Sequence, residues 1–159
     1  MSMPIPISQY LSHHRVDYAI LKHKPTPGAW ETAQAAAIPL EQLVHSIVLQ
    51  QQQHQENLLM VLIPASHQLD IAKVRRATGE PYRLLERPSI KAIFQDCQPG
   101  VIPGLGQPFD LEMLTDIRLF QVPQVYLEDG DATELIKLQH PQFLTLMSSA
   151  PRHDLCHTT

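Results

Sequence analysis

Residues 58–70 read LLMVLIPASHQLD and carry the most informative pattern for the fold. Leu58–Ile63 is apolar at nearly every position, as expected for a central β-strand that is covered on both faces. Asp70 is a good N-cap for a helix over Ile71–Thr78, and Gly79 predicts where that helix ends. The stretch therefore predicts a strand inside a sheet, followed by a short helix.

The segments on either side predict further short elements. Leu43–Leu49 is a second β-branched run, and the polar stretch between it and Leu58–Ile63 predicts that the two form a hairpin. The remaining predicted elements are strands at Asp17–Leu21, Leu111–Thr115, Gln124–Leu127 and Thr133–Leu138, and helices at Ile7–His14, Ala33–Ala37 (with Thr32 as N-cap), Ile90–Phe94 and Pro141–Met147. Because no regular βαβ alternation is present, we expect an α+β domain built on one mixed sheet. Residues 1–147 are expected to form this single domain and residues 148–159 a polar C-terminal tail.

The composition indicates an ordinary globular chain. It has 159 residues, of which 43% are hydrophobic and 18% charged, which argues against disorder. The net charge of −4 excludes a generally basic protein that coats nucleic acid, and no DNA partner is expected. The longest apolar stretch, residues 58–64, is too short to span a membrane, and the N-terminus does not resemble a secretory signal, so a cytoplasmic location is expected. The two cysteines and nine scattered histidines lack metal-ligand spacing, so neither a metal nor another cofactor is expected.

Basic residues are concentrated in one part of the chain. Six of the twelve lie between Lys73 and Lys91, whereas eight of the sixteen acidic residues lie between Asp96 and Glu134. The basic cluster is compatible with a solvated helix face, and also with a patch that contacts a phosphate backbone.

The sequence contains no nucleophile elbow, Walker loop or dinucleotide-binding fingerprint. The most conspicuous segment is Asp96–Gly106, which reads DCQPGVIPGLG. Its glycines let backbone N–H groups approach a ligand closely, so the loop can present amide donors to a carbonyl oxygen or a developing oxyanion. A loop of this composition also serves as a simple tight connection.

Several segments resemble the YbaK/ProX family, which comprises domains associated with prolyl-tRNA synthetases and stand-alone aminoacyl-tRNA deacylases. Asp96–Gly106 is similar to the family's DCEPGAxPPxG loop, and VLIPASHQLD at residues 61–70 is similar to its strand-to-helix segment. Weaker similarities lie at His23–Pro39, Gln42–Leu49 and Glu128–Lys137, in the family's order. The resemblance runs from about residue 7 to residue 147 and implies a mixed, strongly curved sheet flanked by short helices.

The chain departs from the family pattern at four positions. His45 stands where the family has a functional lysine, and Gly104 replaces the second proline of the loop. Ala37 and Ala132 stand where histidines are common. The pattern is kept at Ser46, Gly100, Asp116 and Gly130.

The resemblance implies a site at which His45 and Gly100 are catalytic. The residues expected to bind substrate are Ser46, Ser66, His67, Val101, Ile102, Gly104, Asp116 and Gly130. An unperturbed histidine is mostly neutral at pH 7, so His45 can donate a hydrogen bond or act as a general base, whereas lysine is a cation. His45 is equally compatible with a merely polar role in the pocket wall. Trp30 is interpreted as a packing residue in preference to a lid.

Two functions follow as alternatives. The first is a trans-editing hydrolase that cleaves the ester of mischarged tRNA at its acceptor end. The second is a catalytically degenerate module that binds a small aminoacyl-nucleoside ligand or a protein partner without turnover. The four departures together, at Ala37, His45, Gly104 and Ala132, motivate the second alternative.

Overall fold

The structure is a computed structural model that describes residues 3–158. Its strands are β1 (Ala19–Lys22), β2 (Val44–Gln51), β3 (Leu58–Pro64), β4 (Tyr82–Leu84), β5 (Glu112–Asp116), β6 (Gln124–Glu128), β7 (Glu134–Gln139) and β8 (Arg152–His153). Its α-helices are α1 (Ile5–His13), α2 (Ala29–Ala36), α3 (Ile71–Thr78), α4 (Arg87–Ile93) and α5 (His140–Leu146). Three 3-10 helices are η1 (Leu40–Gln42), η2 (Gln107–Phe109) and η3 (Ile117–Phe120). The predicted α+β class is confirmed.

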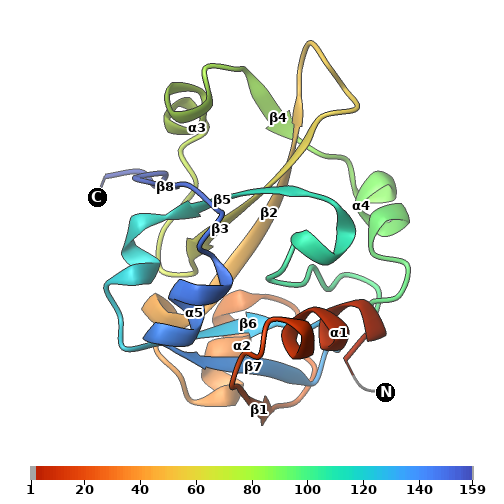
Figure 1. Ribbon diagram of the computed structural model, residues 1–159, viewed down its shortest axis with the longest axis vertical. Coiled ribbons are helices and arrows are strands. Elements are labelled where there is room, and N and C mark those ends of the chain that lie inside the picture. Colours follow the sequence, from red (N-terminus) through yellow and green to blue (C-terminus); the bar gives the residue numbers. More distant parts are fainter. Residues whose placement is uncertain (1–2, 159) are drawn as a thin grey trace.

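The strands form two sheets. A five-stranded mixed sheet has the order β4-β2-β3-β5-β8, and a three-stranded antiparallel sheet has the order β1-β7-β6. A parallel bridge between Leu43 and Tyr126 joins the two sheets next to the start of β2. In Figure 1 the β2–β3 hairpin rises from this junction, while α1 and α5 lie on one face of the small sheet and α2 lies behind it.

Strand β3 is covered on both faces, as its uninterrupted apolar sequence predicts. Met60 and Leu62 point into the main core. Leu59, Val61 and Ile63 alternate with them and pack in a second cluster on the opposite face. β3 pairs with β2 in antiparallel and with β5 in parallel orientation, which makes it the central strand of its sheet.

Helix α3 has the boundaries that its sequence predicts. Asp70 caps the helix by accepting a hydrogen bond from the Ala72 amide at 3.1 Å. Gly79 ends it at a φ of 79°, a left-handed conformation that favours glycine. Val74 is fully buried and fixes the helix against the second cluster.

Two local expectations are wrong. Thr32 does not cap α2, because this helix starts at Ala29 with Gly28 as its N-cap residue, and the Thr32 hydroxyl donates to the Gly28 carbonyl from within the helix. The C-terminal segment also differs from the polar tail expected for residues 148–159. It contains β8, and Leu155 and Cys156 are completely buried because they complete the second apolar cluster.

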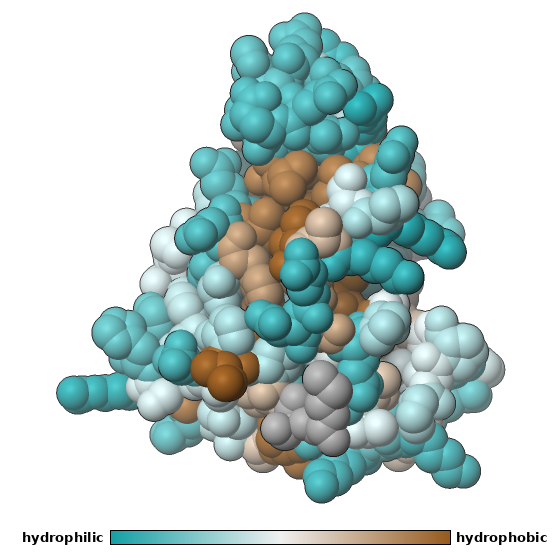
Figure 2. All heavy atoms as spheres, turned by 90° about the vertical axis from the view of Figure 1, so that its right-hand side faces the viewer, coloured by the Kyte–Doolittle hydropathy of each residue, from teal (hydrophilic) through white to brown (hydrophobic). Residues whose placement is uncertain are grey.

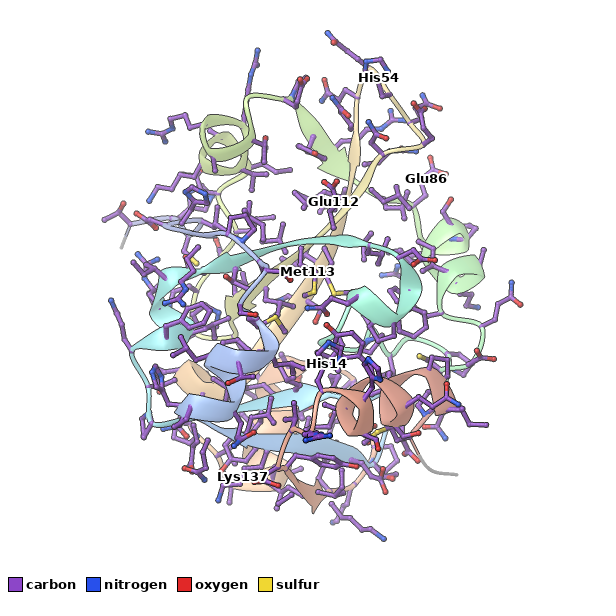
Figure 3. All side chains as sticks on the ribbon, in the orientation of Figure 1. His14, His54, Glu86, Glu112, Met113 and Lys137 are labelled. Carbon is purple, nitrogen blue, oxygen red and sulfur yellow. The ribbon has the colours of Figure 1, made fainter. Side chains whose placement is uncertain are left out.

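The hairpin of β2 and β3 ends in a polar tip. Figure 2 shows this hydrophilic tip above a band of apolar side chains on the side of the molecule that carries α4. In Figure 3, His54 marks the tip and Lys137 of β7 marks the opposite end of the molecule. The first residues of β2 therefore lie near the junction of the two sheets, far from the exposed tip.

Candidate functional site

A cavity of about 210 Å³ opens where the start of β2, helix α2 and the glycine-rich loop meet. Its lining consists of His23, Thr26, Pro27, Gly28, Ala29, Thr32, Leu43, Val44, His45, Ser46, Gly100, Val101, Ile102, Glu128 and Ala132. The cavity thus brings together the predicted residues of β2 and those of the loop, which are more than 50 positions apart in the chain. The chemical roles of these β2 and loop residues remain predictions.

His45 and Ser46 are placed at the cavity by the register of the β2–β3 hairpin, in which they pair with Ile63 and Leu62. The His45 side chain is reached by solvent, but the surrounding protein replaces part of its hydration and lowers its pKa from the usual 6.5. The imidazole is therefore neutral at pH 7. Ser46 is only 6% exposed, and its Oγ has no hydrogen-bond partner within residues 3–158.

The glycine-rich loop is fastened to the end of β6 at two points. The Gln98 amide donates to the Gly130 carbonyl at 2.8 Å, and the Gly104 amide donates to the Glu128 carbonyl at 2.9 Å. Between these points, Gly100 has a φ of 84°, so its conformation favours glycine. The loop therefore has a fixed position relative to β6.

Two amides of this loop are available to a ligand. Within residues 3–158, neither the Gly100 nor the Ile102 amide donates a hydrogen bond, whereas the Val101 amide closes a turn onto Gln98. Gly100 and Ile102 both line the cavity. Free backbone donors beside a cavity are the groups that can stabilise a developing oxyanion.

Gly104 explains one departure from the family loop pattern. A Cβ atom at this position would lie 2.9 Å from the Cβ of Leu127, a separation that real Cβ atoms do not tolerate. A proline would in addition remove the N–H group that donates to Glu128. The close approach of the loop to β6 thus depends on glycine at residue 104.

Glu128 is a cavity residue that the sequence analysis missed. Tyr126 of β6 packs toward α2 and Leu43, and side chains alternate along a strand, so Glu128 points the same way. Partial burial raises the pKa of its carboxyl to about 7. The signal available in the sequence was an acidic residue that directly follows the apolar run VYL.

His23 is the second missed residue. Its Nδ1 lies 2.6 Å from the Lys24 carbonyl oxygen, which can only accept, so Nδ1 carries the hydrogen. In the neutral ring Nε2 is then an acceptor, and this atom is buried without a partner in the described part of the chain. His23 therefore adds an unsatisfied acceptor to the cavity wall.

The other predicted binding residues do not line the cavity. Ser66 and His67 contact each other, with 2.9 Å between Oγ and Nδ1. Gly104, within the loop, donates to the Glu128 carbonyl, and Gly130 accepts from the backbone amide of Gln98, so both hold the loop in place. Asp116 is completely buried and accepts hydrogen bonds from the Arg118 side chain and the Leu155 amide, so it fastens the C-terminal segment.

No metal centre is evident in residues 3–158, because no three His, Cys, Asp or Glu side chains gather there as ligands. The histidines are dispersed, and Figure 3 shows His14 and His54 at well-separated places. Burial raises the pKa of the Cys97 thiol to about 11, so this loop cysteine is not an activated nucleophile.

A second cavity of about 530 Å³ lies between β5, α3 and the C-terminal segment. It is larger than the first cavity, but none of the predicted site residues lines it. No residue of the glycine-rich loop, Asp96–Gly106, is among its lining residues either. The smaller cavity is therefore the candidate site.

The sequence profile of the aminoacyl-tRNA editing domain matches residues 23–146. The chain belongs to this family. No curated protein matches it significantly. The matched range begins with His23 of the cavity and includes the whole lining described above.

Several solved structures of low sequence identity share the fold of this chain. A candidate trans-editing enzyme for prolyl tRNA synthetase is similar with a TM-score of 0.80 and 21% identity, over 99% of this chain and 100% of the other. A hypothetical protein is similar with a TM-score of 0.83 and 18% identity, over 96% and 99% of the two chains. In a candidate signal transduction protein from Marinobacter aquaeolei VT8, the similar region covers 99% of this chain and 31% of that one, with a TM-score of 0.79 and 18% identity.

Proposed function

We propose that this editing-domain protein is an aminoacyl-tRNA deacylase that acts in trans on mischarged tRNA. The observation that supports the proposal is the shared cavity. His45 lines the same small space as Gly100 and Ile102, whose amides donate no hydrogen bond within residues 3–158. Its volume is below the roughly 300–1,000 Å³ of sites for drug-sized ligands. An aminoacyl group is small enough for such a space, and the tRNA would remain outside.

The proposed reaction is attack of water on the ester carbonyl carbon. Neutral His45 accepts a proton from the attacking water, while the Gly100 and Ile102 amides stabilise the oxyanion. Collapse of the tetrahedral intermediate breaks the bond to the ribose oxygen, and the imidazolium returns the proton to that oxygen. The products are the free amino acid and uncharged tRNA. No cofactor takes part in this sequence of steps.

The cellular setting belongs to the same proposal. No helix in residues 3–158 has the length and apolar character that crossing a membrane demands. We propose that the protein works in the cytoplasm, where charged tRNAs are used. Because one similar structure is a candidate trans-editing enzyme for prolyl tRNA synthetase, tRNA specific for proline is the first acceptor to test.

A binding module without turnover is the alternative. It is favoured by one observation, namely that no lysine or arginine lines the cavity. The six basic residues of the cluster between Lys73 and Lys91 lie on or beside α3, β4 and α4, outside the cavity. Without a fixed cation, stabilisation of negative charge would depend on amides alone.

Measurement of amino-acid release from a panel of charged tRNAs, including mischarged prolyl-specific tRNA, distinguishes the two functions. A deacylase releases amino acid faster than the spontaneous reaction, and His45→Ala removes this excess. His54→Ala is a matched control because His54 lies at the exposed hairpin tip. Release at the spontaneous rate for every tRNA would reject the deacylase and favour the binding module.

A further inference from the structure

The cavity holds one acidic residue that the proposed reaction does not use. Among the lining residues Glu128 is the sole carboxylic acid, and neither lysine nor arginine accompanies it. Its side chain makes no hydrogen bond or ion pair with residues 3–158. A partly buried carboxylate without a counterion is unfavourable, so this position is suited to a cation that a ligand brings.

A further acceptor belongs to another residue of the same lining, His23. Its Nε2 is buried and has no partner in the described part of the chain. In the neutral ring Nε2 accepts, because Nδ1 donates to the Lys24 carbonyl. A primary ammonium offers three N–H donors, so it can donate to a carboxylate and to this nitrogen.

We propose that Glu128, assisted by His23, binds the free α-ammonium group of the aminoacyl moiety. The inference rests on the proposed function, since an aminoacyl ester is the ligand that carries this cation into the cavity. The raised pKa of Glu128 is consistent with it, because a carboxyl that is poorly stabilised in the empty cavity gains most from an arriving cation. Glu128 is a specificity residue in this account.

The proposal has a consequence for substrate choice. An ester whose α-amine is acylated, as in peptidyl-tRNA, presents neutral amide in place of ammonium. Such a substrate loses the ionic contact and leaves Glu128 unpaired. The site therefore selects aminoacyl-tRNA against peptidyl-tRNA.

The test uses two stable ligands that differ only at the amine, 3′-deoxy-3′-(L-alanylamino)adenosine and its N-acetyl derivative. Their amide bond resists hydrolysis, and the alanyl methyl group is small enough that side-chain fit is not limiting. Isothermal titration calorimetry at pH 7 is expected to show about 10- to 100-fold tighter binding of the free amine, as charge-assisted hydrogen bonds imply. In Glu128→Gln the preference is expected to fall to about threefold or less, as for a neutral hydrogen bond.

Glu112→Gln is the matched control, because Glu112 is exposed on β5 and lines the other cavity. It is expected to keep the full preference for the amine. Equal binding of both ligands by the unaltered protein, no binding of either, or an unchanged preference in Glu128→Gln would overturn the inference. Thermal melting of each variant verifies that it is folded.

Hydrolysis assays separate this inference from the deacylase proposal. If the preference for the amine depends on Glu128 but no charged tRNA is hydrolysed, the deacylase proposal fails and the ammonium site stands. If aminoacyl-tRNA and N-acetylaminoacyl-tRNA are hydrolysed equally well by the unaltered protein, deacylation stands and the ammonium site fails.

Discussion

Replacing Glu128 by glutamine tests the environment of the cavity without any ligand. Partial burial raises the pKa of this carboxyl from 4.5 to about 7 in the folded protein. In the unfolded chain the carboxyl regains its ordinary pKa. Between pH 4.5 and 7 the folded state therefore holds more protons, and the free energy of unfolding falls as the pH rises. The full destabilisation is present above pH 7 and absent well below pH 4.5.

The size of the effect follows from the pKa rise. Each pKa unit corresponds to about 1.4 kcal/mol, which sets an upper bound of about 3 kcal/mol for Glu128. The cavity is open to water, which screens the carboxylate and reduces the expected effect to about 1–2 kcal/mol. Glu128→Gln cannot ionise. It should thus be more stable than the unaltered protein at pH 8, with little difference at pH 4.5.

Urea unfolding at a series of pH values measures this difference. Asp129 also has a raised pKa, of about 8, and acts in the same direction, so the variant and the unaltered protein must be compared at each pH. A stability gain of 1–2 kcal/mol corresponds to a rise of about 0.5–1 M in the urea midpoint for a slope near 2 kcal/mol/M. Glu112→Gln, on the exposed surface, should change stability by less than about 0.5 kcal/mol. Parallel pH curves for Glu128→Gln and the unaltered protein would refute the assigned burial of this carboxyl.

Three further predictions concern the site and its support. His45→Ala should lower the deacylation rate by about 10²–10⁴-fold, as expected for loss of a general base. Glu128→Gln lacks the cavity carboxyl whose pKa is about 7, so this variant shows the titration of His45. Because the pKa of His45 is lowered, Glu128→Gln should lose activity on acidification only below pH 6.5, and an acidic rate limb above that pH in this variant would contradict the role of His45. Gly104→Ala should destabilise the protein by about 1–3 kcal/mol in urea unfolding because its Cβ would collide with Leu127, and an unchanged midpoint would show that the loop is not held against β6. Trp30 was expected to be a packing residue, but its side chain is 56% exposed beside the cavity residue Ala29. Trp30→Ala should therefore weaken tRNA binding by about 1–3 kcal/mol in a filter-binding assay, because a stacking contact with a base is lost. An unchanged affinity would show that Trp30 makes no such contact.

The fold could be predicted where local chemistry decides the structure. The apolar run of β3 permits only a strand that is covered on both faces, and Asp70 and Gly79 define the ends of α3 through capping. β4 and β8 were missed because they have three and two residues, and each exists only through its pairing with a longer strand.

The candidate site divides in the same way. Position 45 and the glycine-rich loop were found because a departure from a family pattern and an unusual composition are visible in the sequence. Glu128 and His23 were missed because their significance comes from burial and from a missing partner, which are properties of the packed chain. Asp116 was selected by pattern, but its hydrogen bonds to Arg118 and Leu155 show that it supports the C-terminal segment.

The most direct test of the account is to locate an aminoacyl group on the folded protein. Backbone and histidine NMR spectra would be recorded while 3′-deoxy-3′-(L-alanylamino)adenosine is added. We expect the largest shifts at the His45 ring and at the Gly100 and Ile102 amides, and no change at His54 on the hairpin tip. Shifts confined to residues of the larger cavity, such as Thr78 and His153, with the Gly100 amide unaffected, would contradict the proposal that the small cavity is the functional site.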